Sequence, residues 1–127
     1  MGPAGERARG VPPAPRALTG VARIVVIAPE LLLGTRIEET LSAAGHEVTL
    51  SPSAREAPLD AAQLLVVDVE REDPKAVTGL GVPVLGFYPH TDDELRQTAE
   101  AAGVDLVVPR SRLAREMPDL VERLLSA

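Results

Sequence analysis

The sequence contains no cysteine, and this absence removes several kinds of chemistry at once. Disulfides, thiolate nucleophiles and cysteine-ligated zinc sites are all excluded. Aromatic residues make up only 2% of the chain, so the core must be aliphatic and stacking platforms for single-stranded nucleic acid are missing. No apolar run approaches the roughly 20 residues of a membrane span, and the N-terminus lacks the apolar segment of a secretory signal. We therefore expect a cytoplasmic protein with no membrane partner.

Positive charge is scarce outside the first twenty residues. The whole chain has a net charge of −6, of which residues 1–20 contribute +2, so residues 21–127 carry −8. A domain this acidic repels nucleic acid phosphates, and we expect no nucleic acid partner. The only two histidines, His46 and His90, lie far apart in the sequence, so we expect no histidine-rich metal site.

The chain divides into a short leader and one domain. Residues 1–20 include four prolines and four glycines without apolar periodicity, which predicts a disordered leader over residues 1–21. The remaining residues, 22–127, contain enough aliphatic side chains to build one core.

Apolar runs alternate with helical patterns along the domain. The runs are rich in Val, Ile and Leu and short enough to be strands buried on both faces. They are "RIVVI", "HEVTLS", "QLLVVD", "VPVLGFY" and "VDLVV". Because right-handed crossovers return each parallel strand beside an earlier one, the pattern predicts an α/β fold. We expect a flavodoxin-like, doubly wound parallel sheet of five strands in the order 2-1-3-4-5.

The expected helices differ in length. Residues 30–45 form an amphipathic helix that ends at a glycine, and Thr91 begins another in capping-box spacing. Pro118 is best placed in the first turn of the last helix. The second and third helices must be short, because Pro58 interrupts one and little room follows Pro74 in the other. One face of the sheet would then be thinly covered, which favours a homodimer or another partner.

Asp68 is the first candidate for chemistry. It follows an apolar run and would lie where the third strand ends. In the expected topology the carboxyl ends of strands 1 and 3 face a common crevice, which is where such sheets bind ligands.

The order of these segments resembles the receiver (CheY-like) domain of two-component response regulators over residues 23–126. The resemblance rests on "RIVVIAPE", "QLLVVDVE", "VPVLGFYPH" and "AEAAGVDLVVPRS". It implies that Asp68 stands at the phosphorylated aspartate. In the family an acidic pair at the end of strand 1 holds Mg²⁺, and a hydroxyl after strand 4 and a lysine after strand 5 contact the phosphoryl group.

The matching positions depart from the family pattern. Ala28 and Pro29 replace the acidic pair, and Glu30, which follows them, stands about where the first helix starts. Tyr88 takes the hydroxyl position, and Arg110 follows the lysine position by one or two residues. The resemblance therefore implies a degenerate receiver, a pseudo-receiver, with no metal site and no cofactor unless Mg²⁺ serves a working phosphoacceptor.

Three functions remain open. We expect a stand-alone pseudo-receiver that acts by phosphorylation-independent contact with another signalling protein and is not an enzyme. The alternative is a single-domain response regulator phosphorylated on Asp68 by a histidine kinase. A third is a small-molecule-binding domain that uses a crevice near Asp68, Tyr88 and Arg110. By resemblance to the surface that receivers use, the candidate partner contacts are four arginines: Arg96, Arg110, Arg112 and Arg115.

Overall fold

The computed structural model describes residues 21–89 and 92–126. The prediction of a disordered leader falls almost wholly on residues outside these ranges. The strands are β1 (Arg23–Ile27), β2 (Glu47–Ser51), β3 (Leu64–Asp68), β4 (Val84–Tyr88) and β5 (Leu106–Pro109). The α-helices are α2 (Leu31–Ala43), α3 (Asp93–Ala101) and α4 (Arg110–Ser126). Three 3₁₀ helices complete the described elements: η1 (Ala54–Glu56), η2 (Leu59–Ala61) and η3 (Pro74–Ala76).

The five strands form one parallel sheet in the order β2-β1-β3-β4-β5. All five residues of β3 and all five of β4 are buried, as expected for strands covered on both faces. The predicted fold class and strand order are therefore confirmed. In this order β3 lies at the centre of the sheet, so Asp68 ends the central strand.

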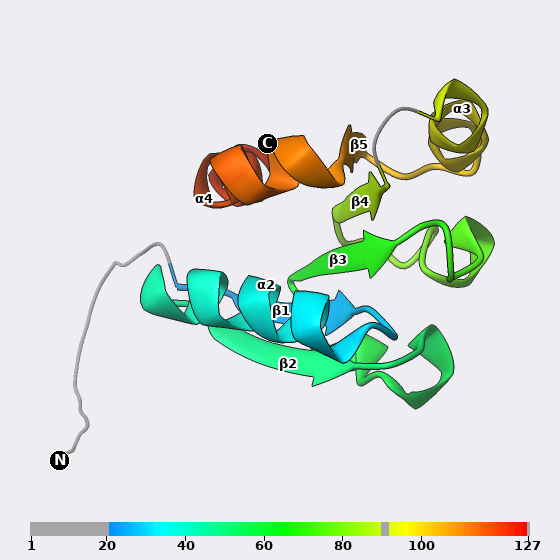
Figure 1. Ribbon diagram of the computed structural model, residues 1–127. Helices are drawn as coiled ribbons and strands as arrows, with labels where there is room; N and C mark the ends of the chain where they lie inside the picture. The colour runs from blue at the N-terminus through cyan, green and yellow to red at the C-terminus, as the bar shows by residue number, and fades with distance from the viewer. Residues whose placement is uncertain (1–20, 90–91, 127) are drawn as a thin grey trace, which may run out of the picture.

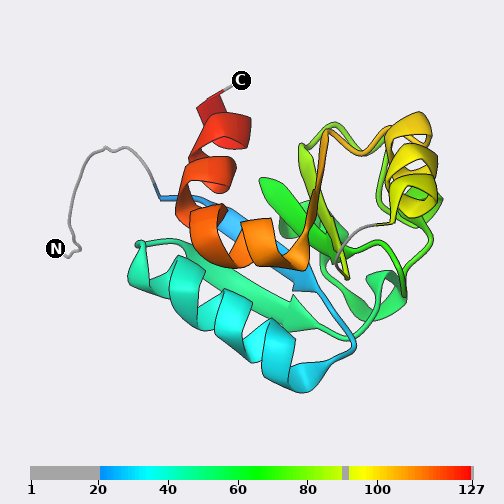
Figure 2. The same cartoon turned by 45° about the horizontal axis from the view of Figure 1, so that its top comes forward.

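Two sets of helices cover the two faces of the sheet (Figure 1). Helices α2 and α4 lie on one face, where Ile37 and Leu113 pack with alternate strand residues such as Val66. Helix α3 and the 3₁₀ helices lie on the other face, where Ala99 packs with strand residues such as Val67. Figure 2 shows α2 and α4 beside each other on the same side of the sheet.

The second and third helices of the fold are reduced to single 3₁₀ turns, as predicted. The β2–β3 connection contains η1 and η2, and Pro58 stands directly before η2. The β3–β4 connection contains η3, where the Asp73 side chain accepts a hydrogen bond from the Lys75 amide at 3.0 Å. Two glycines with positive φ, Gly79 and Gly81, then turn the chain away from a helical path.

The short turns nevertheless cover this face. The inward side chains of the strands there are fully buried, including Leu65 and Val67, each at 0% exposure. Small apolar residues of the connections, such as Val77 and Ala54, are buried against them. The homodimer was predicted because this face of the sheet was expected to be thinly covered. The face is covered, and the homodimer stays a prediction.

The prediction for the last helix was wrong about its start. Helix α4 begins at Arg110 and continues through Pro118, which lies inside it rather than in its first turn. The turns before the proline are held by Leu113 and Met117, which are buried against the sheet. The proline removes one hydrogen bond to the carbonyl of Ala114, and both residues lie on the exposed side, where water can replace that bond.

Helix α3 begins one residue later than the capping-box spacing suggested. Asp92 is its cap, and its Oδ1 accepts a hydrogen bond from the Leu95 amide at 3.0 Å. Thr91, the predicted cap, lies outside the described residues. Among the helices of the described ranges, none is both long and apolar enough to cross a membrane.

Candidate functional site

Asp68 lies at the C-terminal end of β3 with only 1% of its surface exposed. Its Oδ1 accepts hydrogen bonds from the backbone amides of Glu70 at 3.0 Å and Arg71 at 3.3 Å. Its Oδ2 is buried and has no hydrogen-bond partner within residues 21–89 and 92–126. One oxygen is therefore held by backbone amides, and the other is buried without a hydrogen bond from any described residue.

Burial raises the pKa of the Asp68 carboxyl above its ordinary value of 3.8, because the ionised form loses its hydration. The two backbone hydrogen bonds and the positive charge of Arg110 lower the pKa in part, and the negative charge of Glu70 raises it further. The net direction is upward. The site thus holds a carboxyl whose ionised form is costly and whose stabilising side-chain charge is Arg110.

Arg110 is the first residue of α4 and follows β5 directly. Its Nη2 donates a hydrogen bond to Glu30 Oε1 at 2.9 Å, although the two residues are 80 positions apart. Its Nε is buried and has no hydrogen-bond partner in the described part of the chain. The structure therefore brings three sequence candidates, Asp68, Arg110 and Glu30, to one edge of the sheet.

The positions that correspond to the family's acidic pair cannot supply carboxylates. Ala28 is buried, and its backbone amide donates to the Ser51 carbonyl at 3.0 Å, while Pro29 is exposed. Glu30 is the next acidic residue along the chain, and its carboxylate is already bound by Arg110.

Mg²⁺ prefers several hard oxygen ligands around one point. Within the described ranges, no group of three or more His, Cys, Asp or Glu side chains could hold a metal ion. Asp68 alone offers one free carboxylate oxygen, and the guanidinium of Arg110 places a fixed positive charge nearby. The residues present therefore do not fit a magnesium site.

Tyr88 does not join this group. It ends β4 with 4% exposure and packs in the apolar cluster on the α3 face, with residues such as Val69 and Val107. Side chains alternate along a strand, so Asp68 shares the opposite face with Val66, on the side of α2 and α4. Tyr88 therefore lies on the other face of the sheet from Asp68, and the predicted grouping of Asp68, Tyr88 and Arg110 does not include it.

The remaining candidate arginines form ion pairs on their own helices. On α3, Arg96 binds Glu100 at 3.1 Å and approaches Asp93 at 3.7 Å. On α4, Arg112 and Arg115 both approach Glu116 at 3.4 Å. These pairs offset the local positive charge. The expected basic partner surface is thus a set of mixed-charge helix faces on α3 and α4.

One cation at this end of the molecule was missed from the sequence. Arg36, on α2, lines a cavity together with Arg110. An exposed arginine in the middle of a helix carries no distinctive signal in a single sequence. The spacing of Leu33 and Ile37 around it, which directs one face of α2 inward, was the available indication.

Comparisons with known proteins identify the fold. A scan of protein-family models found no match, and a search of the curated proteins found no match either. Among solved structures, the non-phosphorylated HemR receiver domain of Leptospira biflexa shares 18% identity at a TM-score of 0.68, covering 84% of this chain and 95% of that one. The chemotaxis protein CheY4 of Vibrio cholerae shares 19% identity at a TM-score of 0.70, covering 83% and 99%. A CheY-like receiver domain protein of Methanospirillum hungatei shares 18% identity at a TM-score of 0.71, covering 84% and 95%.

These likenesses and the observed topology define the class. The chain has the fold of a response regulator receiver domain, the CheY-like form of the flavodoxin-like fold. The match spans nearly the full length of the receiver domains compared, so the shortened second and third helices are local reductions within that fold. At this level of identity, the comparisons concern the fold alone.

Proposed function

We propose that this protein is a pseudo-receiver, a signalling module that acts by contact with another protein and without phosphorylation of Asp68. The observation that carries the proposal is the ion pair between Arg110 and Glu30 at 2.9 Å. It occupies the one carboxylate left near the end of β1, where Ala28 and Pro29 bring none. A site built in this way rejects the divalent cation that receiver phosphorylation requires.

The electrostatics of the crevice support the same function. Phosphoryl transfer depends on cations and hydrogen-bond donors that are positioned for the transferred group. Here the charge of Arg110 acts on Asp68, while its Nη2 donates a hydrogen bond to Glu30. Tyr88, which takes the family's hydroxyl position, packs on the other face of the sheet. A partner would then bind the unmodified surface of the domain and would not depend on the charge added by phosphorylation of Asp68.

The class of partner is another signalling protein, recognised by surface residues rather than by the crevice. The candidate contacts remain Arg96, Arg112 and Arg115, whose ion pairs are exposed and therefore contribute little to folding. Each arginine can therefore leave the glutamate on its own helix and bind an acidic side chain of the partner. Substitution of these arginines would then weaken partner binding and leave the fold intact.

The second candidate function is the phosphorylatable response regulator. The observation in its favour is Asp68 itself, which ends the central strand. Its Oδ2 accepts no hydrogen bond from the described residues, and Arg110 is close enough to lower its pKa. In that case Arg110 would contact the phosphoryl group and release Glu30.

One spectroscopic experiment separates the two functions. Amide NMR spectra of the full chain are recorded with Mg²⁺ and then with Mg²⁺ and beryllofluoride, for the native protein and for Asp68→Asn. We expect no change at residues around Asp68, Tyr88 and Arg110 in either protein. Changes there in the native protein alone would establish the phosphorylatable function and refute the pseudo-receiver.

A restored variant provides the positive control. The double substitution Ala28→Asp and Pro29→Asp returns an acidic pair to the end of β1 while leaving Asp68 in place. We expect this variant to bind Mg²⁺, since the three carboxylates would then converge on one point. If the variant binds Mg²⁺ and the native chain does not, positions 28 and 29 account for the absence of metal binding. A thermal melt verifies that the variant is folded.

A further inference from the structure

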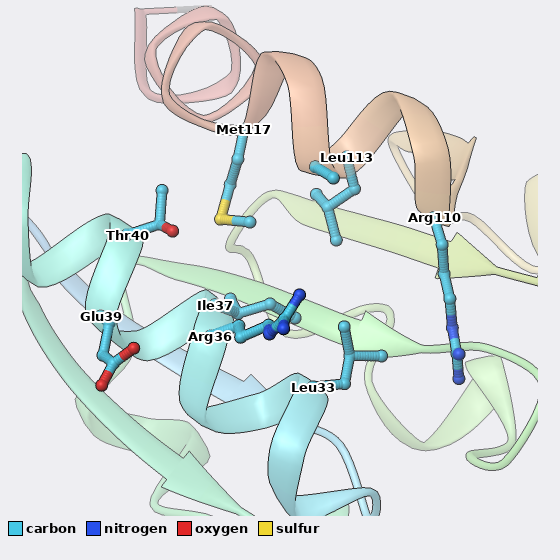
Figure 3. Close-up of a pocket in the computed structure, with 9 residues that line it drawn as sticks. Leu33, Arg36, Ile37, Glu39, Thr40, Arg110, Leu113 and Met117 are labelled. Carbon is cyan, nitrogen blue, oxygen red and sulfur yellow. The ribbon is translucent and has the colours of Figure 1, made fainter.

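A cavity lies between α2 and α4, and Asp68 is not among its lining residues (Figure 3). Its volume is about 290 Å³, which is near the lower end of the range for small-molecule pockets. Leu33 and Ile37 of α2 form one apolar wall, and Leu113 and Met117 of α4 form the other. Each pair is spaced by four residues, so the two helices present continuous apolar stripes to the space between them.

Two guanidinium groups provide the cationic lining of this cavity. Figure 3 shows Arg36 extending from α2 and Arg110 from the start of α4. Arg110 has given one donor to Glu30, but its buried Nε keeps no partner within residues 21–89 and 92–126. Arg36 takes part in no ion pair among the same residues.

The acidic residue of the cavity lining, Glu39, forms no ion pair with either arginine among the described residues. Glu39 lies on the next turn of α2, and Figure 3 shows its carboxylate apart from both guanidinium groups. A second hollow adjoins the cavity and shares Leu33, Arg36 and Arg110 with it, and its lining also includes Glu30, the ion-pair partner of Arg110. The two arginines therefore stand where the two hollows meet.

We propose that the cavity binds a small amphipathic anion, a carboxylate or phosphate monoester that carries a short aliphatic chain. The head group accepts hydrogen bonds from the guanidinium groups of Arg36 and Arg110. The chain of the ligand lies along the apolar walls, for example against Ile37 and Met117. The cavity lining carries two guanidinium groups and one carboxylate, and Arg36 forms no ion pair among the described residues, so the lining favours an anionic ligand over a cationic one.

This site goes beyond the proposed function, since it requires neither a protein partner nor phosphorylation of Asp68. It also differs from the small-molecule crevice expected from the sequence. That crevice was to include Asp68 and Tyr88, and neither residue lines the cavity. Of the three residues expected there, only Arg110 is shared.

The direct test is a titration of the full chain followed by amide NMR. Octanoate and octyl phosphate are the probes, and octylammonium and 1-octanol are the matched controls with the same chain. We expect saturable shifts for α2 and α4 residues around the cavity with both anions, weaker shifts with the alcohol, and none with the cation. The anion that binds more tightly identifies the head group. Octylammonium binding as tight as that of the anions, or no saturable shift with either anion, would overturn the proposal.

Variants localise the binding. Arg36→Gln and Arg110→Gln are each expected to weaken octanoate binding about tenfold, the usual effect of losing a charge-assisted hydrogen bond. Arg123→Gln removes the same charge from the far end of α4 and should leave binding unchanged. Ala114→Leu fills the cavity from an exposed position without altering a charge, and it should also reduce binding. Equal affinities in all four variants would place the binding elsewhere and refute the site.

Discussion

Replacing Arg110 with methionine is expected to lower the free energy of unfolding by about 2 kcal/mol at neutral pH. Losing one partner of a fully buried ion pair costs roughly 3–5 kcal/mol. This cost is an upper bound here, because Arg110 acts on Asp68 through its charge and forms no direct ion pair with it among the described residues. That figure is reduced here because the Arg110 side chain keeps 35% of its surface exposed and water screens its charge. The loss of the half-exposed pair with Glu30 adds about 0.2–1 kcal/mol.

The coupling to Asp68 distinguishes this effect from a simple loss of packing. In the Asp68→Asn background no carboxylate remains to be stabilised, so Arg110→Met should cost less than about 1 kcal/mol there. The difference between the two backgrounds is the interaction free energy of the pair. Arg115→Met serves as the control on the same helix, since the Arg115 side chain is 67% exposed and should contribute little.

The pH dependence of this cost has a definite sign. Burial raises the folded-state pKa of Asp68 above its ordinary value of 3.8, so its ionisation opposes folding. This opposition is complete above the folded-state pKa and disappears as the pH falls toward 3.8. Because the positive charge of Arg110 lowers that pKa, Arg110→Met raises it further. The stability deficit of the variant should therefore be largest at neutral pH and shrink in acid.

Urea unfolding followed by far-ultraviolet circular dichroism measures these quantities, since the chain has no tryptophan and a single tyrosine. Denaturation curves at several pH values give the four free energies of the double-mutant cycle. An Arg110→Met cost that is equal in both backgrounds would refute the charge interaction. A deficit that does not diminish in acid would refute its dependence on the Asp68 carboxylate.

Two further predictions concern the packing that holds the site. Gly86→Ala should cost about 1–3 kcal/mol in urea unfolding, because a Cβ there would lie 2.8 Å from a buried methyl group of Val69. Gly34→Ala meets only a flexible leucine side chain and gains about 1 kcal/mol of helix propensity, so an equal loss in both variants would contradict this reasoning. His46→Ala should cost about 1–3 kcal/mol, because the Ala22 amide would lose the buried Nδ1 that accepts its hydrogen bond at 3.1 Å. Hydrogen exchange at the Ala22 amide checks this loss, and unchanged protection would argue against it.

The fold was predictable because its signals are local and repeated. Short runs of β-branched residues mark strands that are buried on both faces, and the handedness of crossovers then restricts their order. The shortened connections were also visible, since Pro58 interrupts one helical segment and Gly79 and Gly81 leave little room for a helix after Pro74. The start of α4 was not, because tertiary packing of Leu113 and Met117 outweighs the preference of Pro118 for a first turn.

The site was predictable in its residues and less so in their directions. The positions of Asp68, Glu30 and Arg110 followed from the ends of predicted strands, which meet at one edge of a parallel sheet. The face on which a side chain at a strand end lies depends on the alternation that begins deeper in the strand. The position at the strand end alone does not define this face, so Tyr88 was predicted to lie beside Asp68. The hydrogen bond between Glu30 and Arg110 joins residues 80 positions apart, and no pattern in a single sequence reports such a pair.

Arg110 interacts with three different parts of the structure, so we expect substitutions at this position to be restricted. Its guanidinium lowers the pKa of Asp68, binds Glu30 and lines the cavity between α2 and α4. A substitution at this position changes all three environments together, whereas Ala28 and Pro29 can each change without disturbing an ion pair. Among descendants of a common ancestor, we therefore expect positions 30 and 110 to vary in concert. A metal site at this edge of the sheet would then require carboxylates at positions 28 and 29 and the release of Glu30 from Arg110.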